Sequence, residues 1–325
     1  MNKPKILLVI DKPNWAYDQM ANFIIKELSY KYDFYKDYQI MKPKNWKEQI
    51  YYIKFLFDKY RFRKISPNYN IVIYLWWYSP QLIKNIKAKK KLVGIFTECF
   101  PPGNNKEVQG MLPQNFINKY IKPAHGLISG NKNIEDFYGK YDVPVYYATG
   151  STDATFFKYN KKKREDNELR VCWSGNPHRN FKGFFDFVEP AVKLAQEQRP
   201  NIKLITRFSG PLETLPEFYS DVDIMVNATI GDAGPGFIID AGGCGIPTIS
   251  TNVGFASEII IEKENGMLVE RDIEKIAQKI VEVYDDRKLL EKMSKKISID
   301  IQNDWGHNPR AKYWDDMFIK ILKEE

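Results

Sequence analysis

The sequence predicts an α/β protein built from two doubly wound domains that face a cleft. Its 325 residues exceed the size at which one hydrophobic core usually keeps growing, so two domains are expected. Short apolar runs alternate with longer amphipathic stretches, which is typical of a parallel sheet covered by helices. This alternation stops near residues 150–168 and then starts again, which places a domain boundary there.

In the first half, five short apolar runs are the strand candidates. They are Ile6–Ile10, Ile71–Leu75, Leu92–Phe96, Gly126–Ser129 and Val143–Tyr147. Asp18–Leu28 has helical spacing, because its apolar residues share one stripe. We expect another helix over the tyrosine-rich segment Trp46–Tyr60.

The segment Lys158–Glu168 is charged and has no periodicity, so we expect an exposed connection that packs against no core. The second half then repeats the alternation of strands and helices. The predicted strands are Leu169–Trp173, Lys203–Arg207, Ile224–Val226, Thr248–Ser250 and Met267–Val269. The predicted helices are Phe184–Gln196, Ile238–Gly243, Ile273–Tyr284, Arg287–Ile299 and Pro309–Leu322.

Composition limits the class of protein and its compartment. No apolar run reaches the roughly 18 residues that span a bilayer, and three separated cysteines make no metal-ligand spacing, so we expect a cytoplasmic protein. Residues 1–150 carry a net charge of +12, whereas the remainder carries −4. The basic, aromatic first half suggests an anionic partner, such as a membrane surface or a phosphorylated acceptor. A general bias toward lysine explains the charge equally well.

Two loops carry the strongest functional signals. The first follows the strand Ile224–Val226, contains Gly231, Gly234 and Gly236, and leads into a helix that begins near Phe237. Glycines let the backbone approach a ligand closely, and a helix N-terminus offers free N–H groups to an anion. Asp232 and Asp240 flank this turn and can face one cleft.

The second loop is Ser174–Gly183, between a strand and the next helix, and it contains Arg179 and Lys182. Cations at a strand-to-helix turn are suited to hold a diphosphate. The alternative for this loop is an exposed turn whose cations contact water. The alternative for the first loop is that Asp232 caps the helix and Asp240 is merely solvated.

These motifs resemble the donor-binding core of family 4 retaining glycosyltransferases, which have the GT-B fold of two Rossmann-like domains. Cys244–Thr251 is similar to the family's "CGxPVVxT", and Asp232 and Asp240 take the positions of its two glutamates, which have seven residues between them. Four further segments of the chain are similar to family patterns. They are Gly150–Asp153 with Phe157, Phe218–Asp223, Glu258, and Asn265–Val269.

The resemblance implies three segments and a donor site. Residues 1–155 would be the acceptor-binding domain, 156–304 the nucleotide-sugar-binding domain, and 305–325 a helix that crosses back onto the first domain. Asp240 would bind the ribose hydroxyls, Asp232 the sugar ring, and Lys182 the diphosphate. The other expected donor-binding residues are Gly175, Asn176, Arg179, Gly234, Gly236 and Phe237.

The sequence departs from the family pattern at three of these positions. Asn176 stands where the family has arginine, so Arg179 is expected to supply a guanidinium from a different point. Asp232 and Asp240 are each one methylene shorter than glutamate, which shortens their reach by about 1.5 Å. These differences favour an alternative, a non-catalytic sugar-nucleotide or glycan-binding relic.

Acceptor-side candidates follow strands of the first half. Glu98 comes directly after Leu92–Phe96 and could accept a proton from, or orient, the acceptor hydroxyl. Trp76 and Trp77 end another strand, and Asn14 and Trp15 follow the first one. Aromatic faces suit sugar stacking, although tryptophan at a strand end is also commonly a core residue.

The predicted function is a retaining transfer of a sugar from a nucleotide-diphosphate sugar to a glycan or lipid-linked acceptor. We expect Lys182, Asp232 and Glu98 to be catalytic, with no cofactor and no metal. Asp221-Val222-Asp223 resembles a metal motif of another glycosyltransferase fold, but it runs into a buried strand. The basic first domain could contact a membrane. We expect no nucleic-acid partner because no recognition motif is present, and no nicotinamide cofactor because no G-x-G-x-x-G follows the first strand.

Overall fold

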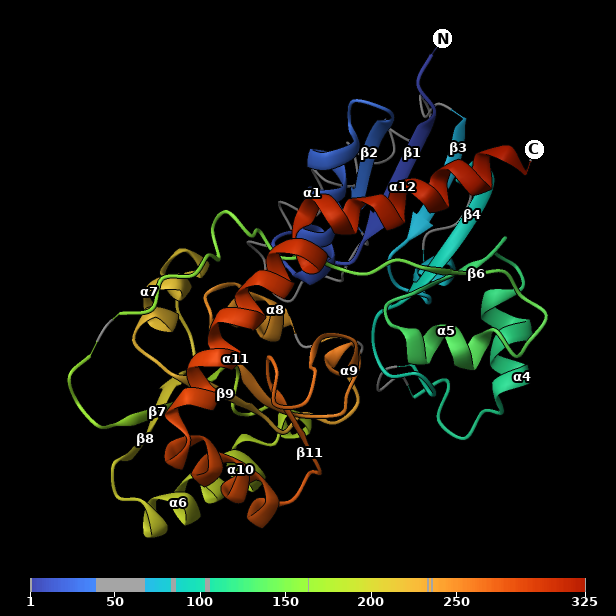
Figure 1. Ribbon diagram of the computed structural model, residues 1–325. Helices are drawn as coiled ribbons and strands as arrows, with labels where there is room; N and C mark the ends of the chain where they lie inside the picture. Colours follow the sequence, from blue (N-terminus) through green and yellow to red (C-terminus); the bar gives the residue numbers. More distant parts are fainter. Residues whose placement is uncertain are drawn as a thin grey trace, which may run out of the picture.

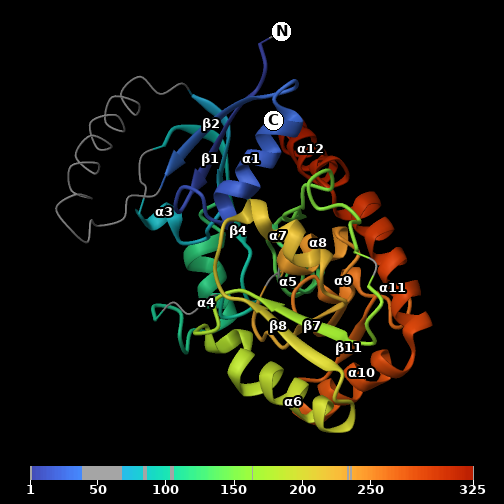
Figure 2. The ribbon, with the colours of Figure 1, turned by 90° about the vertical axis from the view of Figure 1, so that its left-hand side faces the viewer.

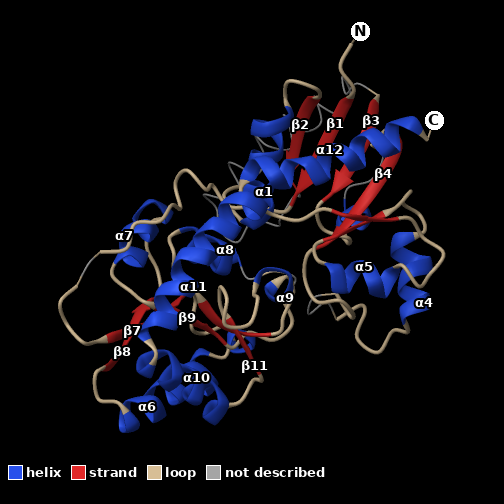
Figure 3. Cartoon of the chain, in the orientation of Figure 1, coloured by secondary structure: helices blue, strands red, loops and turns tan. Residues whose placement is uncertain are grey.

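The computed structural model describes residues 2–38, 68–82, 86–102, 106–162, 164–232, 234 and 236–324. The predicted helix over Trp46–Tyr60 lies outside these residues. Within them the chain forms two parallel sheets, each accompanied by helices (Figures 1 and 3). A search of the same residues finds no helix long and apolar enough to cross a membrane.

The first sheet has six strands in the order β2-β1-β3-β4-β5-β6. Its strands are β1 Lys5–Ile10, β2 Asp33–Tyr38, β3 Tyr69–Tyr74, β4 Ala88–Ile95, β5 Leu127–Ser129 and β6 Val145–Tyr147. Its helices are α1 Ala16–Leu28, α3 Ser79–Leu82, α4 Pro113–Phe116 and α5 Lys132–Tyr138, with a π-helical turn at Ile117–Ile121. Ile6, Leu8 and Ile10 of β1 are buried, as expected of a central strand between two helical layers.

The second sheet has five strands in the order β11-β10-β9-β7-β8. Its strands are β7 Leu169–Ser174, β8 Ile202–Arg207, β9 Ile224–Asn227, β10 Thr248–Thr251 and β11 Met267–Val269. Its helices are α6 Glu189–Gln198, α7 Leu215–Ser220, α8 Gly236–Gly243, α9 Ala256–Ile259, α10 Ile273–Asp285 and α11 Arg287–Asp300. Short helical turns lie at Asn180–Lys182, Phe184–Val188, Leu212–Thr214 and Ile301–Trp305.

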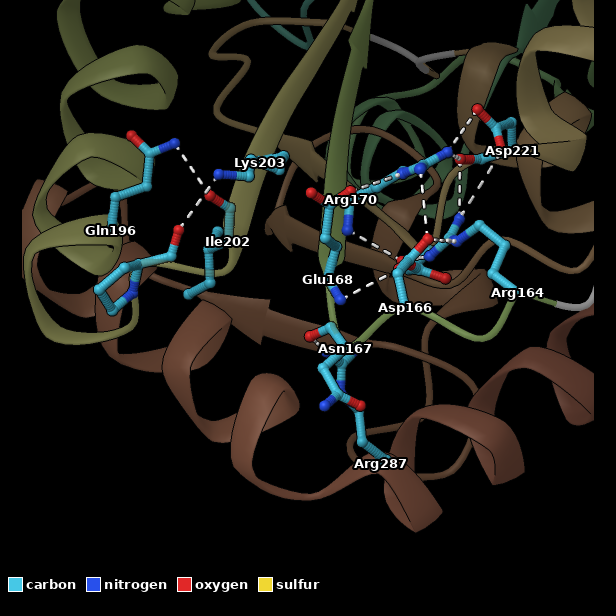
Figure 4. A network of polar contacts seen from close by, with 12 residues as sticks. Arg164, Asp166, Asn167, Glu168, Arg170, Gln196, Ile202, Lys203, Asp221 and Arg287 are labelled. Atoms are coloured by element: carbon cyan, nitrogen blue, oxygen red, sulfur yellow. Dashed lines mark hydrogen bonds and ion pairs between the residues drawn. The ribbon is translucent and has the colours of Figure 1, made fainter.

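The described residues of the charged connection before β7 are exposed or half-buried and join no hydrophobic core, as predicted, and ion pairs hold them against the second domain. Arg164 and Lys161 both pair with Asp223, and Arg170 Nη1 lies 2.6 Å from Asp221 Oδ2. Figure 4 shows Arg164 and Arg170 converging on Asp221 at the amino end of the sheet. Opposite charges on the two segments give this non-periodic stretch a fixed place without an apolar core.

The last helix, α12 His307–Lys323, returns to the first sheet. It packs beside α1, and both views show it lying along the first domain rather than beside α11 (Figures 1 and 2). Trp314 is fully buried in the core that α12 shares with β1, and its Nε1 donates to the Thr149 carbonyl oxygen at 3.0 Å. The chain therefore passes twice between the two sheets.

Glu258 of α9 makes a second junction between the domains. Its Oε1 accepts from the Lys132 backbone N–H at 2.7 Å, at the start of α5. Its Oε2 accepts from the Tyr147 hydroxyl, also at 2.7 Å, and Arg310 of α12 donates to the same hydroxyl at 2.9 Å. One carboxylate of the second domain thus contacts two elements of the first.

We predict that Trp314→Ala destabilises the first domain by about 3–5 kcal/mol, because it leaves a cavity and an unpaired carbonyl oxygen at Thr149. Urea unfolding followed by near-UV circular dichroism measures the effect. Lys312→Ala, at an exposed position of the same helix, is the control and should change the free energy of unfolding by less than about 0.5 kcal/mol. Equal effects of the two variants would contradict the packing role of Trp314.

Candidate active site

The order of the second sheet determines where its loops meet. Winding reverses between β7 and β9, and in open parallel sheets ligands bind beyond the carboxyl ends of the strands at such a point. The two loops singled out from the sequence follow β7 and β9, so the fold places them side by side. A cavity of about 340 Å³ lies there.

Five of the predicted donor residues line this cavity. They are Gly175, Asn176, Lys182, Phe237 and Asp240. Gly175 has φ 140°, and a Cβ atom there would lie 3.4 Å from Lys182 Nζ. The backbone conformation and the close approach of the ammonium group both favour glycine at this position.

Lys182 is held by a short turn that ends at Gly183, where φ is 68° and a Cβ atom would meet the Ala228 carbonyl oxygen at 2.8 Å. Its Nζ lies 5.0 Å from the centre of the Phe237 ring. Burial lowers the pKa of Lys182, although the charge of Asp232 acts in the opposite direction. No carboxylate of the described residues pairs with Lys182 within 4 Å, so its ammonium group is available to an anion.

Asp240 of α8 is enclosed, which contradicts the alternative that it is merely solvated. It lines the 340 Å³ cavity and also a larger cavity of about 650 Å³ between the domains. Its Oδ1 accepts a hydrogen bond from Thr152 Oγ1 at 2.6 Å. Burial raises the pKa of Asp240 to about 7, and the hydrogen bond from Thr152 opposes this shift.

The larger cavity contains the remaining donor candidates. Arg179, Asp232, Gly234 and Gly236 line it together with residues of α1, which lies close to α8 at the junction (Figure 2). Asp232 Oδ1 accepts from the Gly234 backbone N–H at 3.1 Å, a hydrogen bond within the loop that leads into α8.

Gly234 has a packing reason to be glycine. A Cβ atom there would lie 1.7 Å from an atom of the Phe255 ring, so no other residue fits without moving that ring. At Gly236 no atom lies within 4 Å of a Cβ position, so space alone does not require glycine there. Of these two glycines, only the role of Gly234 is explained by the structure.

Glu98 reaches the second domain. It lies against Gly231 in the loop after β9, where a Cβ atom would be 3.0 Å from Glu98 Oε1. The pKa of Tyr17 in α1 is raised by burial and by the charges of Asp11, Asp232 and Glu98. Three carboxylates from both domains therefore act on Tyr17, and of these only Asp232 lines the interdomain cavity.

The tryptophans after β3 are not at this cavity. Trp77 is 1% exposed, and its ring packs against Phe116 and Tyr120 at centroid distances of 4.9 Å. The prediction that Trp77 contacts an acceptor is therefore wrong: its side chain points into the first-domain core. Trp76 is half-buried against Trp77 and Tyr78 and does not line the cavity between the domains.

Asn14 and Trp15 lie at the start of α1, next to Ala16 and Tyr17, which do line that cavity. Asn14 has a left-handed backbone with φ 61°, and its N–H donates to Asp18 Oδ2 at 2.8 Å. Trp15 is half exposed, and Lys12 Nζ lies 4.0 Å from its ring centre. An exposed indole at the rim remains suited to contact a sugar.

Arg207 and Thr152 also lie at this site, although no sequence motif indicated them. Arg207 ends β8 and lines the 340 Å³ cavity, where Pro211 O and Thr214 Oγ1 each accept from its Nη2 at 2.6 Å. Its place at the end of a predicted strand beside β7 was a usable signal. For Thr152 the only signal in the sequence was its position in the segment between the domains, because its partner Asp240 lies 88 residues away.

Two parallel α/β domains with facing strand ends and a helix that returns to the first domain define the GT-B class. Comparison with known proteins agrees with this assignment. Residues 162–286 match the family "Glycosyl transferases group 1". The chain is 30% identical over 236 residues to the capsular polysaccharide biosynthesis glycosyltransferase CapM of Staphylococcus aureus. The matched region covers 71% of this chain and 51% of CapM.

Solved structures resemble the whole fold at low sequence identity. Sucrose-phosphate synthase from Thermosynechococcus elongatus has a TM-score of 0.73 at 12% identity, covering 99% of this chain and all of that one. HepE from Anabaena, in complex with UDP, has a TM-score of 0.65 at 10% identity, covering 97% of this chain and all of HepE. The chain belongs to the glycosyltransferases of GT-B fold. It spans a little over half the length of the curated relatives that it matches.

We predict that Asp240→Asn stabilises the protein at pH 8. The pKa of Asp240 is about 7 in the folded chain against an ordinary value of 3.8, so the folded state binds a proton more tightly. Stability is therefore lost as the pH rises from about 4 to 7, by up to about 4 kcal/mol. Asparagine does not titrate and should not show this loss.

Urea unfolding at several pH values between 4 and 8 measures the difference between Asp240→Asn and the wild type. The free energy of unfolding of Asp240→Asn relative to the wild type should increase up to about pH 7 and then stay constant. Asp316→Asn, at an exposed position of α12, is the control and should follow the wild-type profile. A constant difference across the whole pH range would show that Asp240 is not the titrating group.

Proposed function

We propose that this protein is a retaining, metal-independent glycosyltransferase that moves a sugar from a nucleotide-diphosphate sugar to a glycan or lipid-linked acceptor. The observation that carries the proposal is the partly desolvated ammonium group of Lys182 at the reversal point of the second sheet, which pairs with no carboxylate of the described residues. UDP is the first nucleotide to test, because HepE, which shares the fold, is described in complex with UDP.

Departure of a nucleoside diphosphate builds negative charge on the leaving oxygen. A fixed cation in a site of low polarity stabilises such charge more than water does, since it needs no reorganisation. Lys182 has this setting, and Arg179 lies close enough to lower its pKa. Arg207 on the opposite side of the 340 Å³ cavity adds a guanidinium where Asn176 offers none. Together these residues compensate for the departure at Asn176.

Three carboxylates have distinct proposed roles. Asp240 accepts hydrogen bonds from the ribose hydroxyls, and Asp232, next to the interdomain cavity, contacts the transferred sugar. Glu98 comes from the first domain and lies against the loop of Asp232, so it is placed to accept the proton of the acceptor hydroxyl. Retention of configuration would follow from attack on the same face as the leaving diphosphate.

Asp221 and Asp223 support the expectation of a metal-independent reaction. Both lie at the amino end of β9, away from the donor cavity at its carboxyl end. Asp223 pairs with Arg164 and Lys161, and Asp221 pairs with Arg170. Their charge is thus neutralised by cations of this chain. We further propose a cytoplasmic enzyme whose basic first domain contacts the membrane when the acceptor is lipid-linked.

We predict that Lys182→Ala lowers kcat for sugar transfer at least 100-fold, because the leaving diphosphate loses its buried cation. The assay uses the full chain with UDP- and GDP-linked hexoses and a panel of glycan and lipid-linked acceptors. Lys193→Ala, an exposed lysine of α6, is the matched control and should keep full activity.

Each result of this assay has a defined meaning. Loss of transfer in Lys182→Ala with activity in Lys193→Ala supports the proposal. Equal activity of the two variants overturns the role of Lys182. Nucleotide binding by the wild type without transfer to any acceptor favours the alternative of a non-catalytic relic.

We predict that Glu98→Gln lowers kcat about 100-fold and changes KM for the donor by less than about threefold, because the amide cannot accept the acceptor proton. Steady-state kinetics with saturating acceptor separates the two constants. Glu274→Gln, exposed at the start of α10, is the control. A large rise in donor KM with kcat unchanged would instead assign Glu98 to donor binding.

A further inference from the structure

Two chain segments meet between the domains, and Thr152 lies at their contact. The Thr152 backbone N–H donates to the Trp305 carbonyl oxygen at 3.0 Å, and Thr152 pairs with Gly306 in a parallel bridge. In the adjacent residues, Ser151 Oγ lies 2.8 Å from His307 Nδ1. The backbone of Thr152 is thereby fixed by the segment that leads into α12.

The side chain of Thr152 points away from this backbone contact, to the second domain. Its hydroxyl donates to Asp240 Oδ1 at 2.6 Å, and the residue is only 2% exposed. The other oxygen, Oδ2, accepts no hydrogen bond from the part of the chain that the structure describes. One carboxylate oxygen is thus held by the connecting segment, while the carboxylate as a whole borders both cavities.

We propose that Thr152 is a positioning residue for donor binding, whose hydroxyl orients the Asp240 carboxylate toward the nucleotide cavity. This inference rests on the proposed function, because it assumes that Asp240 binds the nucleotide. The contact joins the segment between the domains directly to the donor site. Donor affinity then depends on a residue that lies outside the second sheet.

The same hydrogen bond affects the charge of Asp240. Burial raises the pKa of Asp240 to about 7 and the Thr152 hydroxyl opposes this, so removing the hydroxyl raises the pKa further. A carboxylate accepts hydrogen bonds from two ribose hydroxyls better than a carboxylic acid does, so affinity is lost as the pH falls through this pKa. Without the hydroxyl, that loss begins at a higher pH.

Other ionisable groups near Asp240 either titrate far above pH 9 or are the same in all the variants that the experiment compares. The Tyr219 phenol faces it from α7 and has a pKa raised well above its ordinary value. The Cys244 thiol, directly after α8, has its pKa raised to about 12. Lys182 and Arg207 share the smaller cavity, and the larger one is also lined by Lys26, Asp153, Arg179, Asp232 and His307. Burial lowers the pKa of His307, and all of these residues are kept in every variant.

The test compares Thr152→Val with Thr152→Ser by calorimetry, using UDP and GDP as probes between pH 6 and 9. Valine keeps the shape and removes the donor, whereas serine keeps the hydroxyl. Thr155→Val is the matched control, since it also removes a hydroxyl that donates to an aspartate, Asp153, at 2.6 Å, in the same segment. Thr155 is exposed.

We expect Thr152→Val to weaken nucleotide binding at least 10-fold at pH 7, and to move the midpoint of the pH dependence upward by about one pH unit. Thr152→Ser and Thr155→Val should stay within about threefold of the wild type with the midpoint unchanged. Wild-type affinity and midpoint in Thr152→Val would overturn the inference. A uniform loss at every pH would also overturn it, because that result indicates disturbed packing rather than an altered carboxylate.

A ligand-free measurement separates this inference from the proposed function. Unfolding between pH 6 and 9 should show that the pH-dependent loss of stability extends to higher pH in Thr152→Val, and that Asp240→Asn abolishes this difference. Thr152→Ala replaces Thr152→Val if the latter does not fold. If the wild type binds neither nucleotide, the proposed donor function fails, while the unfolding profiles still decide whether Thr152 controls Asp240.

Discussion

The hydrogen bonds between the two passages of the chain from one domain to the other fix how the domains face each other. Thr152 pairs with Trp305 and Gly306, and Trp314 then anchors the returning helix through the Thr149 carbonyl oxygen. Because these contacts lie next to α1 and α8, they determine the walls of the interdomain cavity. Glu98 can approach the loop of Asp232 only in this relative placement of the domains.

Within that frame, the donor site depends on charges that are removed from water. No carboxylate among the described residues forms an ion pair with the half-buried Lys182, whereas two other half-buried cations of the second domain, Arg164 and Lys161, are neutralised by Asp223. A buried charge without a partner is destabilising, so its presence at a cavity indicates a ligand that completes it. Burial likewise disfavours the ionised form of Asp240, as its raised pKa shows. Both residues are therefore the first candidates for contact with a bound ligand.

Much of the fold could be predicted because parallel strands buried on both faces are continuous apolar runs. The five strands of the second sheet were predicted close to their observed bounds, and the two-domain α/β class and the glycosyltransferase family are confirmed. β2 was missed, because Asp33–Tyr38 is an edge strand with charged and half-buried residues and lacks such a run. Lys158–Glu168 is exposed or half-buried where the structure describes it, as predicted, but its ion pairs were not foreseen because ion pairs leave no periodic pattern in a sequence.

The candidate site was predictable only as far as local sequence determines it. Gly175, Lys182, Asp232 and Asp240 follow or precede strands whose order brings them together. Trp77 cannot contact an acceptor because its side chain is buried. Its position at a strand end does not indicate which of the two adjacent tryptophans points inward. The partner of Asp240 comes from another domain, so no local pattern could indicate Thr152. The functional roles of these residues stay predictions.

The anchoring of the charged connection to the second sheet has a mechanical consequence. Since Lys161 and Arg164 are tied to Asp223, the free tether between the sheets is reduced to the few residues around Thr152. Because this short tether is also hydrogen-bonded to the returning segment at Gly306, it allows little translation of one domain relative to the other. Any opening of the cleft should therefore be a rotation about this point, and it must break the hydrogen bond between Glu258 and Tyr147.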